Sequence, residues 1–392
     1  MISAVVVDLM VDQTSSYKIA LRHRDALKAE ALAQSGLRLG EMFLVVQSGI
    51  QPFFTNFAEM GVPLPQTTVW DMLPVDSNLF QGLSSGDLPT TFGIDVSEAL
   101  DKRKEEEKEK RDKILQEKEE KTRAVKGTFL PPDGGFGAFE GTFTVKITDE
   151  ESKISFRRWT ELQPAERNRT RKLLESLMLS NKYNYLFKEF TRADMIANIY
   201  DYLDADEIRI DPNAIGDNWG QPFGGSESEL YLGEKGVKPK NAYFDSLEEL
   251  YLVPGFTNRH YQLFAPSLTI YGQDKINILS AKEPVIEALV RFCAKNQQDP
   301  LIFDQKWVEK VAENWTKYKQ TGGGPVSVKG FIGFLQKIPL PVDAKGCEDA
   351  LGVESKNFTL KSQATIGDVT RSFTLVTRVS RGEPERYYFR GQ

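Results

Sequence analysis

The residues whose types and spacing could do chemistry are carboxylates, concentrated between positions 201 and 229. Calcium is a hard cation that takes about six to eight oxygen ligands, often several carboxylates and backbone carbonyls from irregular chain. A loop that returns carboxylates toward a carboxylate-bearing helix end can supply them. One group of acids stands at the end of a predicted helix and the other in the Gly-rich stretch after it: Asp201, Asp204, Asp206 and Glu207, then Asp211, Asp217, Glu227 and Glu229.

The spacing of these acids is not that of an EF-hand loop, which has Gly at its sixth position and Glu at its twelfth. Counted from Asp204, the sixth residue is Arg209. Counted from Asp211, the sixth is Gly216 but the twelfth is Pro222. On the residues alone, two interpretations stay open: a metal site, and an acidic loop that is simply solvated.

The sequence lacks the usual motifs of nucleophilic catalysis, phosphate binding and zinc binding. Neither His has the neighbourhood of a catalytic triad, and no G-x-S-x-G motif occurs. The Gly runs at 134–137 and 321–325 lack the strand and the Lys-Ser/Thr of a phosphate-binding loop, so they predict turns. Two Cys and two His exclude a Cys/His zinc array. Cys293 and Cys347 either form one disulfide in an oxidising compartment or remain two buried thiols.

Composition limits the class of protein. Of the 392 residues, 40% are hydrophobic and 27% are charged, which is enough apolar material for a buried core and excludes global disorder. The formal net charge is −6. A sequence-independent nucleic-acid binder would normally be basic, so that class is disfavoured.

The first predicted element of the chain is a long helix over residues 1–60. It holds no Pro before Pro52, and its apolar and charged residues alternate in an amphipathic pattern. Residues 61–130 predict an irregular connection rich in Pro and Gly. Within it, residues 101–121 carry nine basic and nine acidic side chains, which predicts an exposed, charged helical spacer.

The rest of the chain alternates between strands and helices. Residues 131–164 predict the first strands of a sheet, as a hairpin between Gly141–Ile147 and Ile154–Phe156. Residues 165–320 predict helices, and residues 321–392 predict one more helix and a three-stranded meander. This order favours an α+β fold in which a helical domain is inserted into a domain made of the long helix and an antiparallel sheet.

A helix, a Val-Pro-Gly turn and a second helix over residues 246–264 resemble a helix-hairpin-helix element of DNA-binding proteins. The backbone amides of such a hairpin can hold a phosphate. The charge is unfavourable, because residues 181–315 hold 14 basic and 21 acidic side chains. A DNA-binding protein therefore stays the second hypothesis, and a hydrolase with a carboxylate-bound metal the third.

Several motifs in order resemble one family, the minor pseudopilin K of bacterial type II secretion systems. The resemblance covers most of the chain outside residues 101–121. Each motif is weak alone, and the ordered set is specific. The motifs are Ala29-Glu-Ala-Leu-Ala-Gln-Ser-Gly-Leu-Arg-Leu, Asp149-Glu-Glu-Ser-Lys-Ile-Ser-Phe, Ile199-Tyr-Asp-Tyr-Leu-Asp-Ala-Asp-Glu, Gly224-Gly-Ser-Glu-Ser-Glu-Leu-Tyr, Lys240-Asn-Ala-Tyr-Phe-Asp, Leu268-Thr-Ile-Tyr-Gly, Lys275-Ile-Asn-Ile-Leu-Ser-Ala and Val369-Thr-Arg with Tyr387-Tyr-Phe-Arg.

The resemblance implies a pilin-like fold with a large inserted helical domain of the SAM or helix-hairpin-helix kind. Members of the family have no enzymatic activity. They lie at the tip of the pseudopilus with the I-, J- and H-type pseudopilins, help to initiate its assembly and protein export, and bind no nucleic acid. They are anchored in the bacterial inner membrane by one helix, with the folded domain in the periplasm. Met1–Val11 then resembles the end of that membrane helix, whose first half and leader are absent.

The resemblance also implies calcium as a cofactor in the inserted domain. Carried over by position, the candidate ligands are Asp204 and Asp206 on the helix end, and Glu227 and Glu229 on the returning loop; Asn241 is a weaker candidate. The sequence departs from the family pattern at some positions. Ser228 stands where an acid is usual and Ser226 where Ala is usual, and in the first hairpin motif Ser152 replaces Gly, while Ser155 and Arg157 replace Asn.

Overall fold

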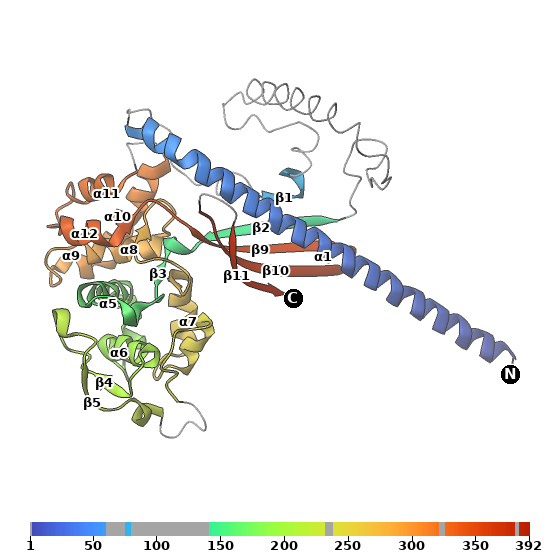
Figure 1. Cartoon of the computed structure of the whole chain (residues 1–392), viewed down its shortest axis with the longest axis horizontal. Helices are drawn as coiled ribbons and strands as arrows, with labels where there is room; N and C mark the ends of the chain where they lie inside the picture. The colour runs from blue at the N-terminus through green and yellow to red at the C-terminus, as the bar shows by residue number, and fades with distance from the viewer. Residues whose placement is uncertain (1, 60–74, 80–140, 232–237, 321–325, 381–383) are drawn as a thin grey trace, which may run out of the picture.

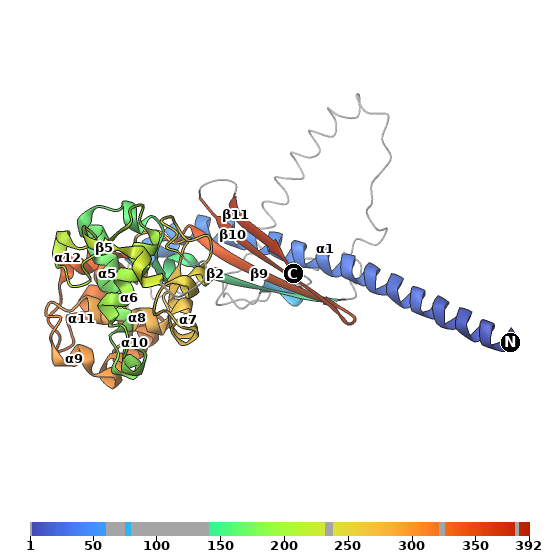
Figure 2. The same cartoon turned by 90° about the horizontal axis from the view of Figure 1, so that it is seen from below.

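The computed structural model describes residues 2–59, 75–79, 141–231, 238–320, 326–380 and 384–392. A long N-terminal helix crosses one face of an antiparallel sheet, and a helical body lies at one end of that sheet (Figure 1). The view from below shows the same three parts, with the N-terminal half of the helix extending away from the helical body (Figure 2). The predicted α+β class, with its long first helix and antiparallel sheet, is confirmed. The predicted connection and charged spacer at 61–130 lie almost wholly outside the described residues.

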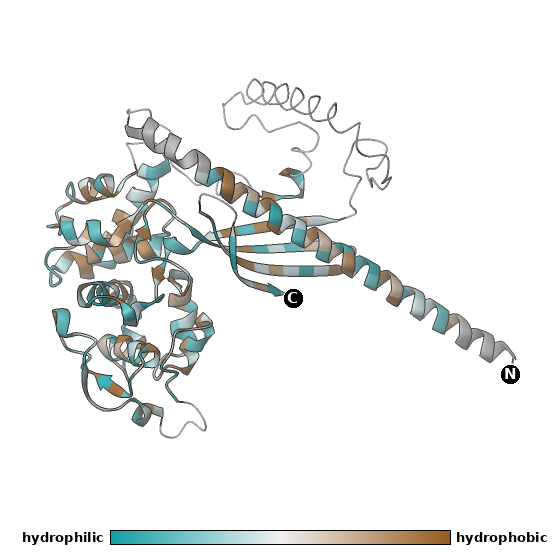
Figure 3. Ribbon diagram, viewed as in Figure 1, coloured by the Kyte–Doolittle hydropathy of each residue, from teal (hydrophilic) through white to brown (hydrophobic). Residues whose placement is uncertain are grey.

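The long helix α1 spans Ile2–Glu59. Between residues 29 and 44 it buries side chains at steps of three and four, which places them along one face. From residue 10 to residue 20 its side chains are exposed. Hydrophobic colouring gathers where α1 crosses the sheet (Figure 3). The buried residues between positions 29 and 44 are Ala29, Leu32, Ala33, Gly36, Leu37, Leu39, Gly40, Glu41 and Leu44.

The sheet contains five of the described strands in the order β1-β2-β9-β10-β11. Their bounds are Val75–Asp76, Thr142–Asp149, Asn357–Ile366, Val369–Arg378 and Glu385–Gly391. The last three form the predicted meander, with antiparallel pairing throughout. Side chains on one face of β9 and β10 pack on α1 in a core that contains no residue of the helical body.

The helical body is inserted between two neighbouring strands. The chain leaves the sheet after Asp149, and it returns at Asn357. The strands on either side pair directly, with Asp149 opposite Phe358. The body has its own hydrophobic core, whose buried members run from Ile154 to Leu351.

The helical body consists of short helices joined by 3-10 turns and two-residue strands. Its short strand pairs are β3–β6 and β7–β8, both parallel, and β4–β5, antiparallel. The α-helices are α5 (Pro164–Met178), α6 (Arg192–Leu203), α7 (Asn258–Phe264), α8 (Glu283–Phe292), α9 (Pro300–Phe303), α10 (Gln305–Gln320), α11 (Val328–Leu335) and α12 (Ala344–Ala350). The strands are β3 (Ile154–Ser155), β4 (Ile208–Ile210), β5 (Pro222–Ser226), β6 (Leu268–Thr269), β7 (Ile276–Asn277) and β8 (Leu351–Gly352).

Two sequence-based predictions differ from the structure. The predicted hairpin between Gly141–Ile147 and Ile154–Phe156 is wrong, because β2 pairs with β1 and β9, whereas β3 pairs with β6. A buried 3-10 turn at Glu150–Ser152 separates the two segments and directs the chain into the helical body. The helix predicted within 321–392 is α11, and it packs in the core of the helical body rather than with the sheet, as do Ile154, Phe156 and Trp159.

Cys293 and Cys347 form a disulfide. It joins the end of α8 to α12, across a sequence separation of 54 residues. Ala294 and Val342 form a β-bridge beside it. These links hold residues 342–350 against the helical body, so the body extends to the point where the chain re-enters the sheet.

Among the described residues, no helix is both long enough and apolar enough to cross a membrane.

Candidate metal centre

The C-terminal end of α6 positions two acids of the centre. The helix begins with a capping box, in which the Thr191 hydroxyl accepts a hydrogen bond from the backbone of Asp194 and the Asp194 carboxylate accepts one from the backbone of Thr191. Nine consecutive residues from Met195 to Leu203 are buried, so the last turn of the helix is held within the body. Asp201 lies in that turn, and Asp204 follows as the C-cap residue in extended conformation.

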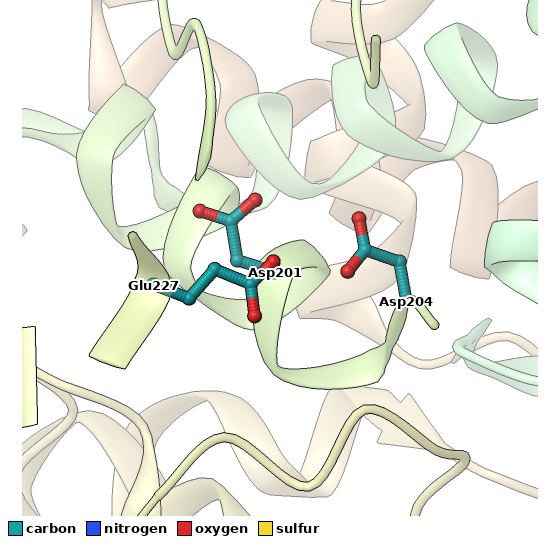
Figure 4. Close-up of side chains that lie close together, drawn as sticks. All are labelled: Asp201, Asp204 and Glu227. Carbon is teal, nitrogen blue, oxygen red and sulfur yellow. The ribbon is translucent and has the colours of Figure 1, made fainter. Parts of the chain in front are cut away.

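The β4–β5 hairpin brings the third acid back to the same place. Ile208 pairs with Ser226, and Gly224 and Gly225 both adopt positive φ on the returning strand. The backbone N–H of Glu227 then donates to the carbonyl of Glu207 at 3.2 Å. This hydrogen bond places the Glu227 side chain beside those of Asp201 and Asp204 (Figure 4).

The three carboxylates converge closely enough to share one ion. One oxygen from each of Asp201, Asp204 and Glu227 lies within 4.8 Å of the other two. Two oxygens bound to a single calcium ion at about 2.4 Å can be at most about 4.8 Å apart, so the spacing suits calcium. All three side chains are buried, with Glu227 only 1% exposed.

Several of these oxygens lack the partners that burial normally requires. No donor within the described part of the chain satisfies Asp204 Oδ1, Glu227 Oε1 or Glu227 Oε2. Asp201 Oδ1 accepts one hydrogen bond, from the backbone of Ile210 at 3.2 Å. Buried polar atoms are almost always hydrogen-bonded, and buried charges are paired or coordinate metals. The described residues also provide no ion pair to any of the three.

The electrostatics agree with this geometry. Burial raises the pKa of Asp201 and that of Asp204 to about 7, and the charge of Asp206 adds to both shifts. Burial, followed by the charges of Asp204 and Asp201, raises the pKa of Glu227 to about 9. Arg209 and Arg167 lower the pKa values of Asp201 and Asp204 only in part. A cation among the three would offset the repulsion that adds to the effect of burial, and it would favour the charged form of each acid.

Asn241 and Asp206 lie together at the edge of the cluster. Asn241 is held in the left-handed conformation, with φ of 51°, and its backbone N–H donates to Tyr202 at 3.1 Å. Its Nδ2 donates to the carbonyl of Asp206 at 2.5 Å, while its buried Oδ1 has no hydrogen-bond donor. The Asp206 carboxylate is partly used, because it accepts from the backbone of Ile208 at 2.7 Å.

These carboxylate oxygens therefore fit calcium. They are hard ligands that surround one point, and several of them are buried without a hydrogen-bond partner. Of the residues predicted from the sequence, the structure brings Asp204 and Glu227 into the cluster and places Asp206 and Asn241 beside it. Glu229 is exposed and is not part of the cluster. Asp201 was noted among the acids of the helix end but was not chosen as a ligand. Its position three residues before Asp204, on the same side of a helix, is the signal that could have identified it.

Comparison with known proteins gives a limited result. No protein-family model matches the chain, and no curated protein matches it. Among solved structures, it is similar to a chain of the GspK-GspI-GspJ complex from the type 2 secretion system of enterotoxigenic Escherichia coli, with 16% identity, a TM-score of 0.44, and coverage of 69% of this chain and 84% of that chain. A similarity of this size leaves the function to be argued from the chain's own residues and fold.

Proposed function

We propose that this protein is a non-enzymatic minor pseudopilin that caps the tip of the pseudopilus of a type II secretion system and helps to initiate its assembly. The observation that carries the proposal is the insertion of a whole helical body, with its own core, between two paired strands of a helix-on-sheet domain. The ordered sequence motifs that resemble the pseudopilin K family fall on this architecture from α1 to β11.

The architecture suits a subunit that ends a filament. A helix-on-sheet subunit can polymerise when its long helix packs among the helices of its neighbours. Here the exposed N-terminal part of α1 extends away from the body (Figure 2). The helical body lies at the opposite end, where a further subunit would have to stack. Its bulk would block that position, so this chain can be the last subunit but not an internal one.

The remaining parts of the proposal concern location, partners and calcium. The disulfide between Cys293 and Cys347 supports an oxidising compartment such as the periplasm. We propose anchoring in the inner membrane, and pseudopilins of the I, J and H types as partners. Calcium, held by Asp201, Asp204 and Glu227 with Asn241 and Asp206 at the edge, would stabilise the β4–β5 hairpin by binding only the folded state.

The test is assembly with the smaller pseudopilins. We expect the chain to co-elute on size exclusion with the periplasmic parts of the I- and J-type pseudopilins of the same organism. Ile19 and Leu27 are exposed apolar residues on α1 (55% and 69% exposed), so Ile19→Asp with Leu27→Asp should weaken the complex without changing the melting temperature.

The matched control for that pair is Gln13→Asp, which places the same acid at an exposed polar position of α1 and should leave the complex intact. Failure to form any complex with these pseudopilins would remove the capping proposal. A loss of the complex with Gln13→Asp as great as with the apolar pair would show that the apolar contacts are not responsible.

A further inference from the structure

A second group of buried acids lies far from the metal centre, at the point where the chain leaves the sheet. Asp149, Glu150 and Glu151 are consecutive, and they are 4%, 3% and 2% exposed. We call these three residues the junction turn. Three adjacent buried carboxyl groups are costly to maintain, since each must be paired, hydrogen-bonded or neutral. Nothing in the proposed capping or calcium-binding function uses them.

The contacts of Asp149 tie the sheet to the helical body. Its Oδ2 accepts from Asn277 Nδ2 at 3.2 Å and Ser355 Oγ at 2.5 Å, and from the hydroxyl of Ser280. Its Oδ1 accepts from the backbone N–H of Glu151 at 2.9 Å. The side-chain donors come from β7, from the residues just after β7 and from the segment that leads back to the sheet. These donors lower the pKa of Asp149 only in part, because burial outweighs them and raises it.

The other two acids complete the junction. Glu151 accepts from the backbone N–H and Nδ2 of Asn357, the first residue of β9, at 3.0 and 2.7 Å. Glu150 pairs with Lys153 at 3.0 Å and accepts from the hydroxyl of Thr269 on β6. The junction turn thus contacts β6 and β7 of the helical body and the segment through which the chain returns to the sheet.

Asp149 and Glu151 are the pair whose protonation matters. Both are buried, and the backbone N–H of Glu151 on Asp149 Oδ1 at 2.9 Å holds the two residues against each other. Neither forms an ion pair with a basic side chain of the described residues. Two neighbouring buried carboxyl groups without a cation repel each other when both are charged, so one of them holds a proton. Glu150 differs from them, because Lys153 already balances its charge.

Other charged groups near this pair do not remove the need for a proton. The backbone N–H of Lys356 donates to Glu151. A hydrogen bond with Tyr387 is the main cause that raises the pKa of Arg378 on β10, and the charge of Glu151 adds a smaller contribution. Lys275, Glu354 and Lys356 line the cleft of about 560 Å³ that Glu151 also borders, so both signs of charge face the turn there. Lys275 lies just before β7, and Glu354 and Lys356 lie in the segment that leads to β9.

We propose that the junction turn is a proton-dependent joint: one proton held between Asp149 and Glu151 keeps the helical body fixed on the sheet, and loss of that proton loosens the connection. The orientation of the body relative to the long helix then depends on the pH around the protein. The joint is distinct from the proposed calcium site, and it stands on the contacts of Asp149 and Glu151 whether or not the chain is a pseudopilin.

The direction of the effect follows from burial. Burial, and then the charge of Asp149, raises the pKa of Glu151 to about 8, and burial raises the pKa of Asp149. An unfolded Glu loses its proton near pH 4.5. Between that pH and about 8 the folded state therefore holds a proton that the unfolded state has released, so stability falls as pH rises through this range and its contribution is lost above about pH 8.

The experiment measures the distance between the two parts of the molecule as a function of pH. Spin labels are attached at Lys361→Cys on β9 and Lys310→Cys on α10, both exposed positions. We expect a narrow distance distribution at pH 6 and a broader or displaced one at pH 9. In Glu151→Gln, which keeps an acceptor for Asn357 and is neutral at every pH, the distribution should stay narrow at both pH values.

Two further variants keep the result interpretable. Glu150→Gln is the matched control, a neighbouring buried acid outside the proton-sharing pair, and should keep the pH response of the parent chain. Ser355→Ala removes one donor to Asp149, which makes a second negative charge harder to accommodate, so it should move the midpoint of the transition to higher pH. If Glu151→Gln does not fold, Ser355→Ala takes its place as the test of the proposal. An unchanged distribution from pH 6 to pH 9 in the parent chain, or an equal broadening in Glu151→Gln, would overturn the proposal.

Discussion

At the scale of single residues, the molecule carries carboxylates that its own chain does not satisfy. Glu227 is 1% exposed, and neither of its carboxylate oxygens has a donor in the part of the chain that the structure describes. In the absence of a cation, burial and the neighbouring acids raise the pKa of Asp204 to about 7 and that of Glu227 to about 9, so a proton on one of the two reduces the repulsion. Binding of calcium would replace that proton and pull the β4–β5 hairpin onto α6.

The first prediction is that calcium raises the melting temperature and that a chelator lowers it. At a calcium concentration of a hundredfold the Kd, one site adds about 2.7 kcal/mol to the free energy of unfolding. Differential scanning calorimetry with calcium and with chelator measures the difference. Glu227→Gln should abolish it, because Gln offers one neutral oxygen in place of a carboxylate.

The control for that variant is Glu229→Gln. Glu229 lies on the same returning segment and is exposed, so its neutralisation should leave most of the calcium response intact. Coincident melting curves for the parent chain with and without chelator would remove the metal site. If Glu229→Gln abolished the calcium response as fully as Glu227→Gln, the calcium ion would have to bind nearer the surface than the buried cluster.

The second prediction concerns the pH dependence of calcium binding. Without the ion, the raised pKa values of Asp201 and Asp204 (about 7) and of Glu227 (about 9) keep the cluster partly protonated at neutral pH. Protons and calcium compete for the same oxygens, so affinity should increase as pH rises from 5 to 9. Isothermal titration at several pH values measures both the affinity and the protons released. An affinity that does not change over this range would mean that these acids are not the ligands.

Sequence reasoning found part of this centre. The return of Glu227 toward Asp204 was expected, because a helix ending in acids was followed by a Gly-rich loop with more acids. The sequence does not identify Asp201 as a ligand, because an acid between Tyr200 and Tyr202 in the last turn of a helix gives no sign of burial. Glu229 was included because alternate acids in a loop look equivalent, and only the hairpin register determines that Glu227 points inward and Glu229 does not.

At the scale of elements, the packing of α1 on the sheet depends on two glycines. A Cβ at Gly36 would lie 2.6 Å from Ser362 Oγ and 2.8 Å from Phe143 Cδ2, and one at Gly40 would lie 2.6 Å from Leu360 Cδ2. The helix can therefore approach β2 and β9 only where side chains are absent. On the edge strand β11, Arg386 forms a two-point ion pair with the buried Glu41 of α1, at 2.9 and 2.5 Å.

The third prediction tests this close approach. Gly36→Ala should lower the free energy of unfolding by about 1–3 kcal/mol, because overpacking outweighs the gain in helix propensity. Gly333→Ala in α11 is the control, since a Cβ there meets nothing within 4 Å. It should stabilise by about 0.5–1 kcal/mol. Chemical denaturation measures both variants, and a stabilised Gly36→Ala would refute the close-packing argument.

The strands show where local patterns stop being informative. The alternation of Phe143 and Val145 correctly predicts a strand, since both side chains are buried against α1. The partner of that strand was predicted wrongly, because the next apolar segment, at Ile154, seemed close enough for a hairpin. Its actual partners are β1 and β9, and β9 lies more than two hundred residues later in the chain. Pairing over such a separation depends on the inserted body bringing its two ends together, which no local pattern encodes.

At the scale of the whole molecule, the two hydrophobic cores are separate. The buried members of one are all between Ile154 and Leu351, and those of the other are on α1 and the strands outside this range. The order of helix, strands, helices and strands was sufficient to predict an insertion. The boundaries were not predictable, because α11 and α12 have no feature that assigns them to one core rather than the other. Their position is determined by long-range contacts, including the disulfide from Cys293 to Cys347.

The fourth prediction is that each part folds without the other. Asp149 and Phe358 face each other in the register of β2 and β9, so a two-residue Asn-Gly turn can replace residues 150–357 and join the strands as a hairpin. This shortened chain should melt cooperatively, keep its strand signal in circular dichroism and show no response to calcium. Residues 150–356 expressed alone should keep the calcium response, because the acids and the core of the helical body are all retained. The prediction is wrong if the body folds only when the sheet is present, or if the shortened chain stays unfolded. In either case the contacts of the junction turn are needed for folding, and the two cores form one cooperative unit.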